Sequence, residues 1–434
     1  MAGGDAGCDD REAVHVVLVT VGTRGDVQPF VALGVGLRDA GHDVTVATND
    51  DFAGFVAGRG LGFRAVGGNF RERLESPLGR EWIESAGSLR RYMRVGRRFL
   101  SRDLQDRLSR DVGRTLVDAD AVVFYTFALT AYADAEARRI PVVAAALVPW
   151  HPSPEQAPVF LPRAPRIGWL RRWVGNVTHR KLWEIGREQL QAYRRELGLA
   201  PLSHGDPWGD LRRRGVPMLH LYSEHLSPRP RDWRDDEVVT GFCFLDDQER
   251  LPDELERFLA AGPPPVYVGF GSMTGRDPEE LHTLAARALA SAGQRGVIAT
   301  GWGSTGTSDD DNFVVESVAH EPLFARVAAA VHHGGAGTTA ASLRAGLPTV
   351  VTPFFGDQPY WAHQVHRLGA GPKPLRRNAL SADRLARAID RAVSTPAYRE
   401  NARRIGALLD AEDGVGRATA FLNGCFNPRG SRSR

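Results

Sequence analysis

Residues 332–358 read HHGGAGTTAASLRAGLPTVVTPFFGDQ, a stretch that predicts the fold class of the chain. The apolar run 327–331 directly before it predicts a buried parallel strand. The glycine-rich turn at 334–337 permits a tight backbone, and a helix opened by two threonines follows over about 338–345. The run 349–352 predicts the next strand. A strand, a turn, a helix and a second strand form the repeating unit of a doubly wound α/β sheet.

The turn and the start of the helix also predict an anion site. Gly335 and Gly337 allow backbone amides to face a ligand, and Thr338 begins a helix whose dipole favours negative charge. A phosphate group is the usual occupant of such a helix start. The residues 354–358, which follow the next strand, reach the same carboxyl edge of the sheet, where open α/β folds bind ligands.

A second strand-turn-helix signature lies near the start of the chain. The apolar run VHVVLVTV at 14–21 breaks into GTRGDVQPF at 22–30, and a helix is expected over about 29–40. The segment GHDVTVATN at 41–49 is the next strand with its entry turn. This βαβ opening lacks the G-x-G-x-x-G pattern, which argues against an NAD or FAD domain.

These two signatures resemble those of nucleotide-sugar glycosyltransferases with the GT-B fold. The resemblance is greatest to sterol glucosyltransferases and to bacterial enzymes that glycosylate macrolide- and glycopeptide-type antibiotics. It covers most of the chain, and it is strongest at 14–70 and 265–375 and weakest at 70–230. It implies two Rossmann-like α/β domains that face each other across a cleft, the first binding the acceptor and the second the sugar donor.

The domain organisation follows from the alternation of strand-like and helical runs. Two alternating sets are separated by a stretch rich in Pro, Asp and Gly, which contains a short strand near Val238. Together with the resemblance, this pattern predicts an acceptor-binding domain at 1–227, an interdomain region at 228–264, a donor-binding domain at 265–410 and a C-terminal helix at 411–434 that crosses back to the first domain.

Asp26 is the candidate general base. Glycosyl transfer to a hydroxyl requires that a proton leave the acceptor oxygen as it attacks the anomeric carbon, and a carboxylate facing the cleft can take it. The resemblance agrees, because antibiotic-type members place the proposed base at the Asp of this TRGD loop. The alternative role for Asp26 is the N-cap of a helix that starts at Val27 or Gln28, and the two roles are compatible. Arg24 either steadies the diphosphate or is solvated.

The resemblance assigns the donor site. His333 matches the residue that donates a hydrogen bond to a donor phosphate, and Asp357 with Gln358 matches the pair that binds sugar hydroxyls. Ser272 ends a strand and suits a phosphate contact, and the loop around Val318 resembles the one that holds the nucleotide base. The full set of expected donor-binding residues is Thr23, Ser272, Val318, His333, Gly335, Gly337, Thr338, Asp357 and Gln358.

No cofactor and no metal ion are expected. Metal-dependent glycosyltransferases need an Asp-x-Asp at a strand end, and the acidic triplet 309–311 lies in a Ser/Thr/Gly loop that indicates a solvated turn. Adjacent His332 and His333 point to opposite faces of a strand, so they do not form a metal pair. Retaining GT-B enzymes carry two glutamates eight apart, and neither Glu316 nor Glu321 has such a partner, which favours inversion.

The acceptor side is less defined. Trp150 and His151, in LVPWHPSP at 147–154, are expected to line an apolar acceptor pocket, although a surface loop fits the same residues. The segment 89–112 holds 8 Arg among apolar residues. As an amphipathic basic helix it either makes weak contact with an anionic membrane surface or packs by its apolar stripe.

Composition sets the broad class. A chain of 434 residues exceeds one ordinary core, and 42% hydrophobic with 25% charged residues is globular. The net charge of +3 is too small to indicate nucleic-acid binding. Cys8, Cys243 and Cys425 show no paired spacing, as in a reducing compartment. Without a signal peptide or an apolar run of about 18 residues, the expected location is the cytoplasm.

We therefore expect an inverting glycosyltransferase that moves a hexose from a UDP- or dTDP-sugar to a hydroxyl of a hydrophobic acceptor, a polyketide or macrolide-type aglycone or a sterol. One alternative is a membrane-lipid or sterol glucosyltransferase that uses UDP-glucose at a membrane surface. Others are a nucleotide-sugar epimerase with the same fold, or a non-catalytic nucleotide-sugar-binding partner protein. Neither the sugar nor the oligomeric state follows from the sequence.

Overall fold

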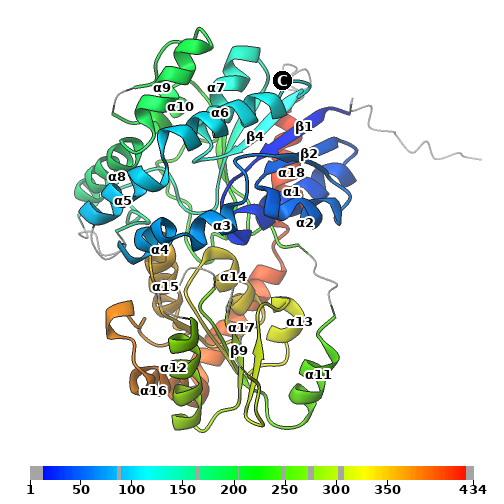
Figure 1. Cartoon of the computed structure of the whole chain (residues 1–434), viewed down its shortest axis with the longest axis vertical. Helices are drawn as coiled ribbons and strands as arrows, with labels where there is room; N and C mark the ends of the chain where they lie inside the picture. The colour runs from blue at the N-terminus through cyan, green and yellow to red at the C-terminus, as the bar shows by residue number, and fades with distance from the viewer. Residues whose placement is uncertain are drawn as a thin grey trace, which may run out of the picture.

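The computed structural model describes residues 13–85, 89–161, 167–203, 205–245, 250–271, 278–301 and 307–426. Two parallel sheets with surrounding helices lie one above the other along the long axis of the molecule (Figure 1). The expected fold class, two doubly wound α/β domains, is confirmed. Within the described ranges, no helix combines the length and apolar character needed to cross a bilayer.

The first sheet has seven parallel strands in the order β3-β2-β1-β4-β5-β6-β7. Its side chains alternate between two cores: Val16 and Leu18 of β1 pack into one, and Val17 and Val19 into the other. Helices therefore cover both faces, as a parallel sheet requires. The strands are β1 (His15–Val19), β2 (Asp43–Thr48), β3 (Gly62–Ala65), β4 (Ala121–Tyr125), β5 (Val142–Ala146), β6 (Met218–His220) and β7 (Glu237–Val239).

The strand expected near Val238 is β7, and it belongs to the first sheet. It pairs in parallel with β6, with His220 opposite Val239. The first sheet thus extends past residue 227, into the stretch expected to connect the domains. Helix α11 (Asp253–Ala260) follows and packs Leu255 against the second domain.

The helices of the first domain surround its sheet, and α3 and α4 lie at the boundary with the second domain (Figure 1). They are α1 (Arg24–Asp39), α2 (Ala53–Ala57), α3 (Phe70–Glu75), α4 (Pro77–Glu84), α5 (Leu89–Phe99), α6 (Arg102–Thr115), α7 (Leu129–Arg138), α8 (Gly168–Trp183), α9 (Arg187–Glu196) and α10 (Pro207–Arg213), with a short 3-10 turn at Asp50–Phe52.

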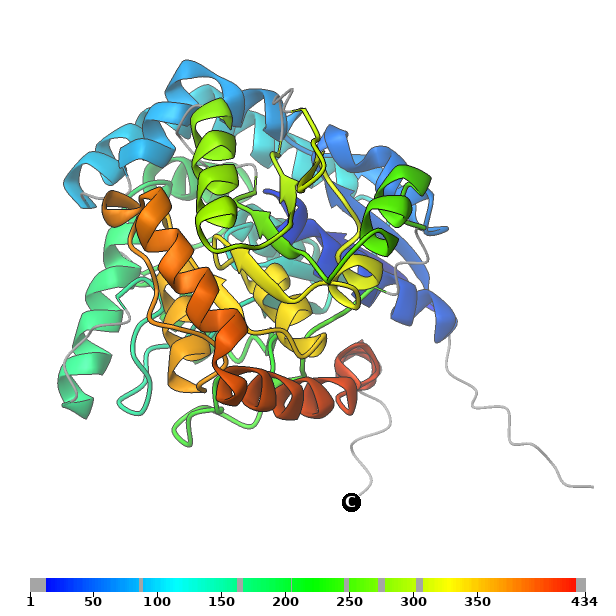
Figure 2. The same cartoon turned by 90° about the horizontal axis from the view of Figure 1, so that it is seen from below.

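The second sheet has five parallel strands in the order β10-β9-β8-β11-β12. These are β8 (Val266–Gly269), β9 (Gly296–Ala299), β10 (Asn312–Val315), β11 (Ala329–His332) and β12 (Thr349–Val351). Helices α12 and α16 pack side by side on one face (Figure 2). The helices are α12 (Pro278–Ser291), α13 (His320–Phe324), α14 (Ala336–Arg344), α15 (Gln358–Arg367), α16 (Ala382–Ser394) and α17 (Pro396–Asp410), with a 3-10 turn at Arg377–Ala379.

The last helix, α18 (Gly414–Phe426), packs on the first domain rather than the second. Ala418 and Leu422 enter the core beneath β1 and α1. A side chain at Gly36 of α1 would meet Val415 at 2.3 Å, so glycine is needed where the two helices touch. The Asn423 amide oxygen lies 2.8 Å from His42 Nε2. The end of the chain thereby ties the two domains together.

Candidate functional site

The carboxyl ends of both sheets face a shared cavity of about 1710 Å³ between the domains. Single ligand sites usually occupy roughly 300–1,000 Å³, so this cavity has room for two molecules. Its lining divides by domain: the first domain contributes a largely aromatic and aliphatic half, and the second contributes glycines, His333 and the loop after β12.

Asp26 lies at the start of α1 and faces this cavity. The helix begins at Arg24, five residues before the expected start, because Thr23 is its N-cap and Asp26 is its third residue. The Thr23 amide and hydroxyl both donate to Asp26 Oδ2, at 2.8 and 3.0 Å. Asp26 is therefore not the N-cap itself but the acidic partner of a capping box.

Gly22 makes this arrangement possible. Its φ of +142° is rarely adopted by other residues, and a Cβ there would lie 2.4 Å from Asp26 Oδ2. The carboxylate is packed so closely that burial raises its pKa, while hydrogen bonds from Thr23 and Tyr125 lower it. The net effect is a raised pKa, which is typical of a group that exchanges protons near neutral pH.

Tyr125, which the sequence analysis did not identify, completes the surroundings of Asp26. It is the last residue of β4, and its ring packs edge-on against Phe30 and Phe127, with centroids 6.1 and 5.4 Å apart. Burial raises the pKa of Tyr125 well above its usual value, and the charges of Asp26 and Asp357 add to this. The sequence feature that could have identified Tyr125 is its position at the carboxyl end of a buried strand, where open α/β folds bind ligands.

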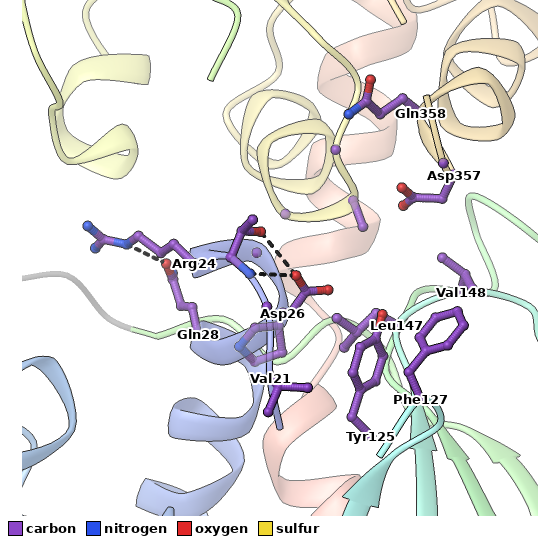
Figure 3. Close-up of a pocket in the computed structure, with 18 of the residues that line it drawn as sticks. Val21, Arg24, Asp26, Gln28, Tyr125, Phe127, Leu147, Val148, Asp357 and Gln358 are labelled. Carbon is purple, nitrogen blue, oxygen red and sulfur yellow. Dashed lines mark hydrogen bonds between the residues drawn. The ribbon is translucent and has the colours of Figure 1, made fainter. Parts of the chain in front are cut away.

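Asp357 faces Asp26 from the other domain (Figure 3). It precedes α15, and Trp361 Nε1 donates to its Oδ2 at 2.8 Å. Burial raises the pKa of Asp357 to about 6, and the nearby charge of Asp26 contributes. The cavity thus brings together two carboxyl groups, one from each domain, whose protonation is electrostatically linked.

Gln358, the expected partner of Asp357 in sugar binding, is partly committed to the fold. Its Oε1 accepts hydrogen bonds from the amides of Phe354 and Phe355, at 2.8 and 3.1 Å. The side chain is buried and lines the cavity. It therefore shapes the loop, and only its Nε2 donor is left for a ligand.

The two adjacent histidines point in opposite directions. His332 faces the interior, where its Nδ1 accepts from the Gly334 amide at 2.9 Å and its Nε2 lies 3.3 Å from Ser342 Oγ. His333 lines the cavity beside Gly335. Burial lowers the pKa of His333 to about 4, so its ring is neutral at pH 7.

Two glycines hold the His333 ring. A Cβ on Gly271 would approach His333 Cε1 to 3.0 Å, and a Cβ on Gly335 would approach its Nε2 to 2.7 Å. Gly335 is the N-cap of α14, and Gly337 and Thr338 of its first turn also line the cavity. The helix start, its free amides and the neutral imidazole together offer donors to an anion.

The remaining donor-side residues are partly placed. Val318 lines the cavity next to His320, whose Nε2 lies 3.2 Å from the Tyr267 hydroxyl. Burial lowers the pKa of His320 to about 4, and its ring stacks on Phe324 at 4.7 Å. Ser272 lies outside the residues that the structure describes.

The structure places one residue of the acceptor-side pair at the cavity. Trp150 lines the cavity and stacks on His179, with ring centroids 5.0 Å apart. His151 does not line it: the ring is buried 4.0 Å from Glu237, and burial holds its pKa well below the usual value. The expectation for His151 is wrong because successive residues after β5 point to opposite sides.

Most of the apolar lining of the cavity was not predicted from the sequence. The segment 89–112 forms α5 and α6, whose Tyr92 and Val112 face the cavity, so its apolar stripe packs inward. Further aromatic side chains on the first-domain side are Phe70, Trp82, Phe127, Phe160, Trp173 and Trp208. They come from segments far apart in sequence, and no local pattern groups them.

In the described part of the chain, no three His, Cys, Asp or Glu residues converge as a metal-binding group. The acidic triplet at 309–311 shapes a turn, since Asp309 Oδ1 accepts from the amides of Asp311 and Asn312, at 3.0 and 2.7 Å.

Two family models match the chain. Residues 16–152 match the glycosyltransferase family 28 N-terminal domain, and residues 306–412 match the erythromycin biosynthesis protein CIII-like C-terminal domain. The chain is 34% identical to the O-mycaminosyltylonolide 6-deoxyallosyltransferase of Streptomyces fradiae, over 94% of this chain and 97% of that one. It is 33% identical to a sterol 3-beta-glucosyltransferase of Arabidopsis thaliana, over 94% of this chain but only 65% of that protein's length.

Solved structures support the fold. The kitacinnamycin glycosyltransferase is similar at a TM-score of 0.67 and 21% identity, over 96% of this chain and 99% of that one. The glycosyltransferase VinC, solved with dTDP, is similar at a TM-score of 0.62 and 19% identity, over 95% and 100% of the two chains. The architecture described above is shared with these enzymes across almost the whole chain.

Proposed function

This chain belongs to the GT-B glycosyltransferase family that includes the deoxyallosyltransferase and sterol glucosyltransferases above, and from this premise we propose its reaction. It moves a hexose from a UDP- or dTDP-sugar to a hydroxyl of a hydrophobic acceptor, with inversion at the anomeric carbon. The observation that carries the proposal is Asp26 of one domain facing Asp357 of the other across a cavity with one aromatic half.

The donor lies in the half made by the second domain. Its diphosphate meets the amides at the start of α14 and the neutral ring of His333, and its base lies along the loop at Val318. Thr23, which also lines the cavity, adds a hydroxyl on the phosphate side. Two structural neighbours were solved with dTDP, which supports a pyrimidine nucleotide as the donor's carrier.

The acceptor lies in the half made by the first domain. The apolar surface there suits a rigid hydrophobic skeleton that carries a free hydroxyl, and Trp150 forms part of its wall. The relatives are named for transfer to a tylonolide derivative and to sterols, and both compound classes have this character.

In the reaction, Asp26 removes the proton of the acceptor hydroxyl as its oxygen attacks the anomeric carbon. The bond from that carbon to the diphosphate oxygen breaks in the same step, and the leaving charge is stabilised by the α14 amides and His333. The amide and hydroxyl of Thr23 keep the Asp26 carboxylate oriented. Asp357 and the Gln358 Nε2 hold the sugar hydroxyls, and the closed cavity limits attack by water.

We also propose that no metal ion takes part, because the α14 helix start and His333 already meet the phosphate charge. Transfer should then persist after treatment with EDTA. Activity that disappears with EDTA and returns with Mg²⁺ would contradict this part of the proposal.

The first test is ligand binding. In a thermal-shift panel of UDP, dTDP, GDP, ADP and NADH, only UDP or dTDP should raise the melting temperature. A ligand at about 100 times its dissociation constant adds roughly 2.7 kcal/mol of stability. A response to NADH, or none to either pyrimidine nucleotide, would mean that the donor site is misassigned.

The second test is D26N with D39N as its control, since Asp39 is an exposed carboxylate at the other end of α1. We expect D26N to abolish transfer and leave nucleotide affinity within about twofold, because only the proton acceptor is lost. D39N should transfer normally. Full activity of D26N would remove Asp26 from the mechanism.

A further inference from the structure

Helix α8 and the two described residues Leu161 and Ile167 that precede it expose an unusual set of large apolar side chains, here termed the α8 patch. Trp169 is 70% exposed, Trp173 55%, Ile167 54% and Leu161 46%. The two tryptophans are four residues apart and so lie on one face of the helix. Large side chains of this kind are normally buried, and their clustering on a surface marks an interaction site.

The α8 patch borders the opening of the cavity. Leu161 and Trp173 are exposed and also line the cavity, as does the exposed Phe127. Apolar surface therefore continues from the outside of the molecule into the half assigned to the acceptor. These side chains offer apolar contacts to a hydrophobic molecule that enters the cavity.

Helix α5 adds positive charge beside this opening. It lines the same cavity with Tyr92 and exposes five arginines, and it contains no acidic residue. Arg97 reaches Glu184 at the end of α8 at 3.4 Å, which places the two helices side by side (Figure 1). Among the described residues, no carboxylate lies within ion-pair distance of Arg90, Arg91 or Arg94.

We propose that the α8 patch and Arg90, Arg91 and Arg94 form a docking surface for an anionic lipid bilayer. Tryptophans anchor at the level of lipid headgroups, and unpaired arginines are attracted to anionic lipid. A membrane explains both features together, whereas an apolar partner surface would leave the arginines unpaired. Combined with the proposed function, docking sets the acceptor half of the cavity against the bilayer in which a hydrophobic acceptor dissolves.

The experiment is flotation of the full chain with vesicles of phosphatidylcholine alone and of phosphatidylcholine mixed with phosphatidylserine. Wild type should float with the anionic vesicles, and added salt should weaken this. R90Q/R91Q/R94Q should lower the partition coefficient on the order of 100-fold, since each arginine contributes roughly a factor of five. W169S should lower it as well, because it removes the more exposed tryptophan.

The matched control is R384Q/R387Q/R391Q, which removes three exposed arginines from α16 of the second domain. It should float like wild type. Equal loss in this control, absence of wild-type flotation, or flotation that ignores lipid charge would each overturn the proposal. So would a concentration-dependent dimer that W169S abolishes, because the patch would then belong to a second copy of the chain.

Flotation does not depend on catalysis, so it separates this proposal from the proposed function. If transfer fails for every donor while anionic vesicles still bind, only the proposed function is lost. Where transfer is measurable, R90Q/R91Q/R94Q should act normally on an acceptor presented in detergent and slowly on the same acceptor in anionic vesicles. Equal rates in both presentations would contradict acceptor entry from the bilayer.

Discussion

The two carboxylate oxygens of Asp26 have different roles: one binds within the protein, and the other is available to the acceptor hydroxyl. One oxygen is held by Thr23 at the start of α1, and the Tyr125 hydroxyl at the end of β4 lowers the pKa of the carboxyl group further. Burial alone raises the pKa of a carboxyl group, and these donors limit the rise. At the scale of the residue, the proposed base is therefore tuned by partners from two different elements.

Y125F tests this tuning. Loss of the Tyr125 hydroxyl removes a hydrogen bond that lowers the pKa of Asp26, so that pKa should rise further. The base must be ionised to act, and the acidic limb of the pH profile of kcat/KM should move to higher pH. We expect a loss of roughly three- to tenfold at pH 6 that recovers toward pH 9, with donor affinity unchanged.

The control is Y132F, which removes the hydroxyl of a buried tyrosine outside the cavity lining. Its pH profile should match that of wild type. An unshifted profile in Y125F would show that this hydroxyl does not act on Asp26.

D357N tests how much the buried carboxyl group of Asp357 lowers the free energy of unfolding. The folded pKa of Asp357 is about 6, above the usual unfolded value of roughly 3.9. The folded protein binds the extra proton between these values, so the free energy of unfolding falls as pH rises through this window. D357N cannot ionise and escapes this loss, while its amide oxygen still accepts from Trp361.

We therefore expect D357N to be more stable than wild type by about 2 kcal/mol at pH 7.5 and equally stable near pH 4, by thermal unfolding. The exposed Asp390 provides the control D390N, which should show neither effect. A stability gain that is independent of pH would contradict the explanation by buried charge.

At the scale of the element, the start of α14 is where a local sequence pattern becomes a binding surface. The positive φ of Gly334 makes a tight turn that leads the chain directly from β11 into α14. At the N-cap position, Gly335 lies so close to His333 that there is no room for a side chain. The glycines therefore position the imidazole as well as free the amides.

G335A should displace the His333 ring, because a Cβ would lie 2.7 Å from its Nε2. We expect nucleotide affinity to fall on the order of tenfold, as in H333A, through loss of a charge-assisted hydrogen bond. Isothermal titration with UDP and dTDP measures it. G424A, where an added Cβ meets nothing within 4 Å, should bind normally. Unchanged affinity in both G335A and H333A would remove the histidine from the donor site.

At the scale of the whole molecule, contacts on two sides hold the domains around the cavity. At its mouth, Arg71 of α3 pairs with Glu316 after β10 at 3.2 Å, and Phe355 packs against the helices α3 to α5. At the opposite side, the Tyr360 hydroxyl lies 2.6 Å from Ser227 Oγ. The Arg71–Glu316 ion pair is largely exposed and therefore weak, as expected for a contact that must open.

A charge swap tests the contact at the mouth. R71E places like charges opposite each other and should lower kcat/KM about two- to fivefold, with more hydrolysis of the donor, because closure becomes less favourable. R71E/E316R should restore most of the loss, and high salt should reduce the difference. If kcat/KM of R71E/E316R were no higher than that of R71E, the Arg71–Glu316 pair would not contribute to domain closure.

The local strand-turn-helix units of this protein could be predicted from its sequence. Hydrophobic periodicity and turn-forming residues predict the order of strand, glycine turn and helix at 329–344. The same signals predict that Asp26 lies in the turn between the first strand and the first helix. These signals act within a few residues, and the fold class and the site assignments for His333 and Asp357 rest on them together with the family resemblance.

The contacts between these units became known only from the three-dimensional structure. It placed Tyr125 beside Asp26, turned His151 inward toward Glu237, added β7 to the first sheet and directed the apolar side of α5 into the cavity. Each outcome depends on strand pairing and burial between segments distant in sequence. The same long-range packing raises the pKa of Asp26 and of Asp357, because it buries both carboxyl groups. The residues next to them in the sequence do not predict this burial.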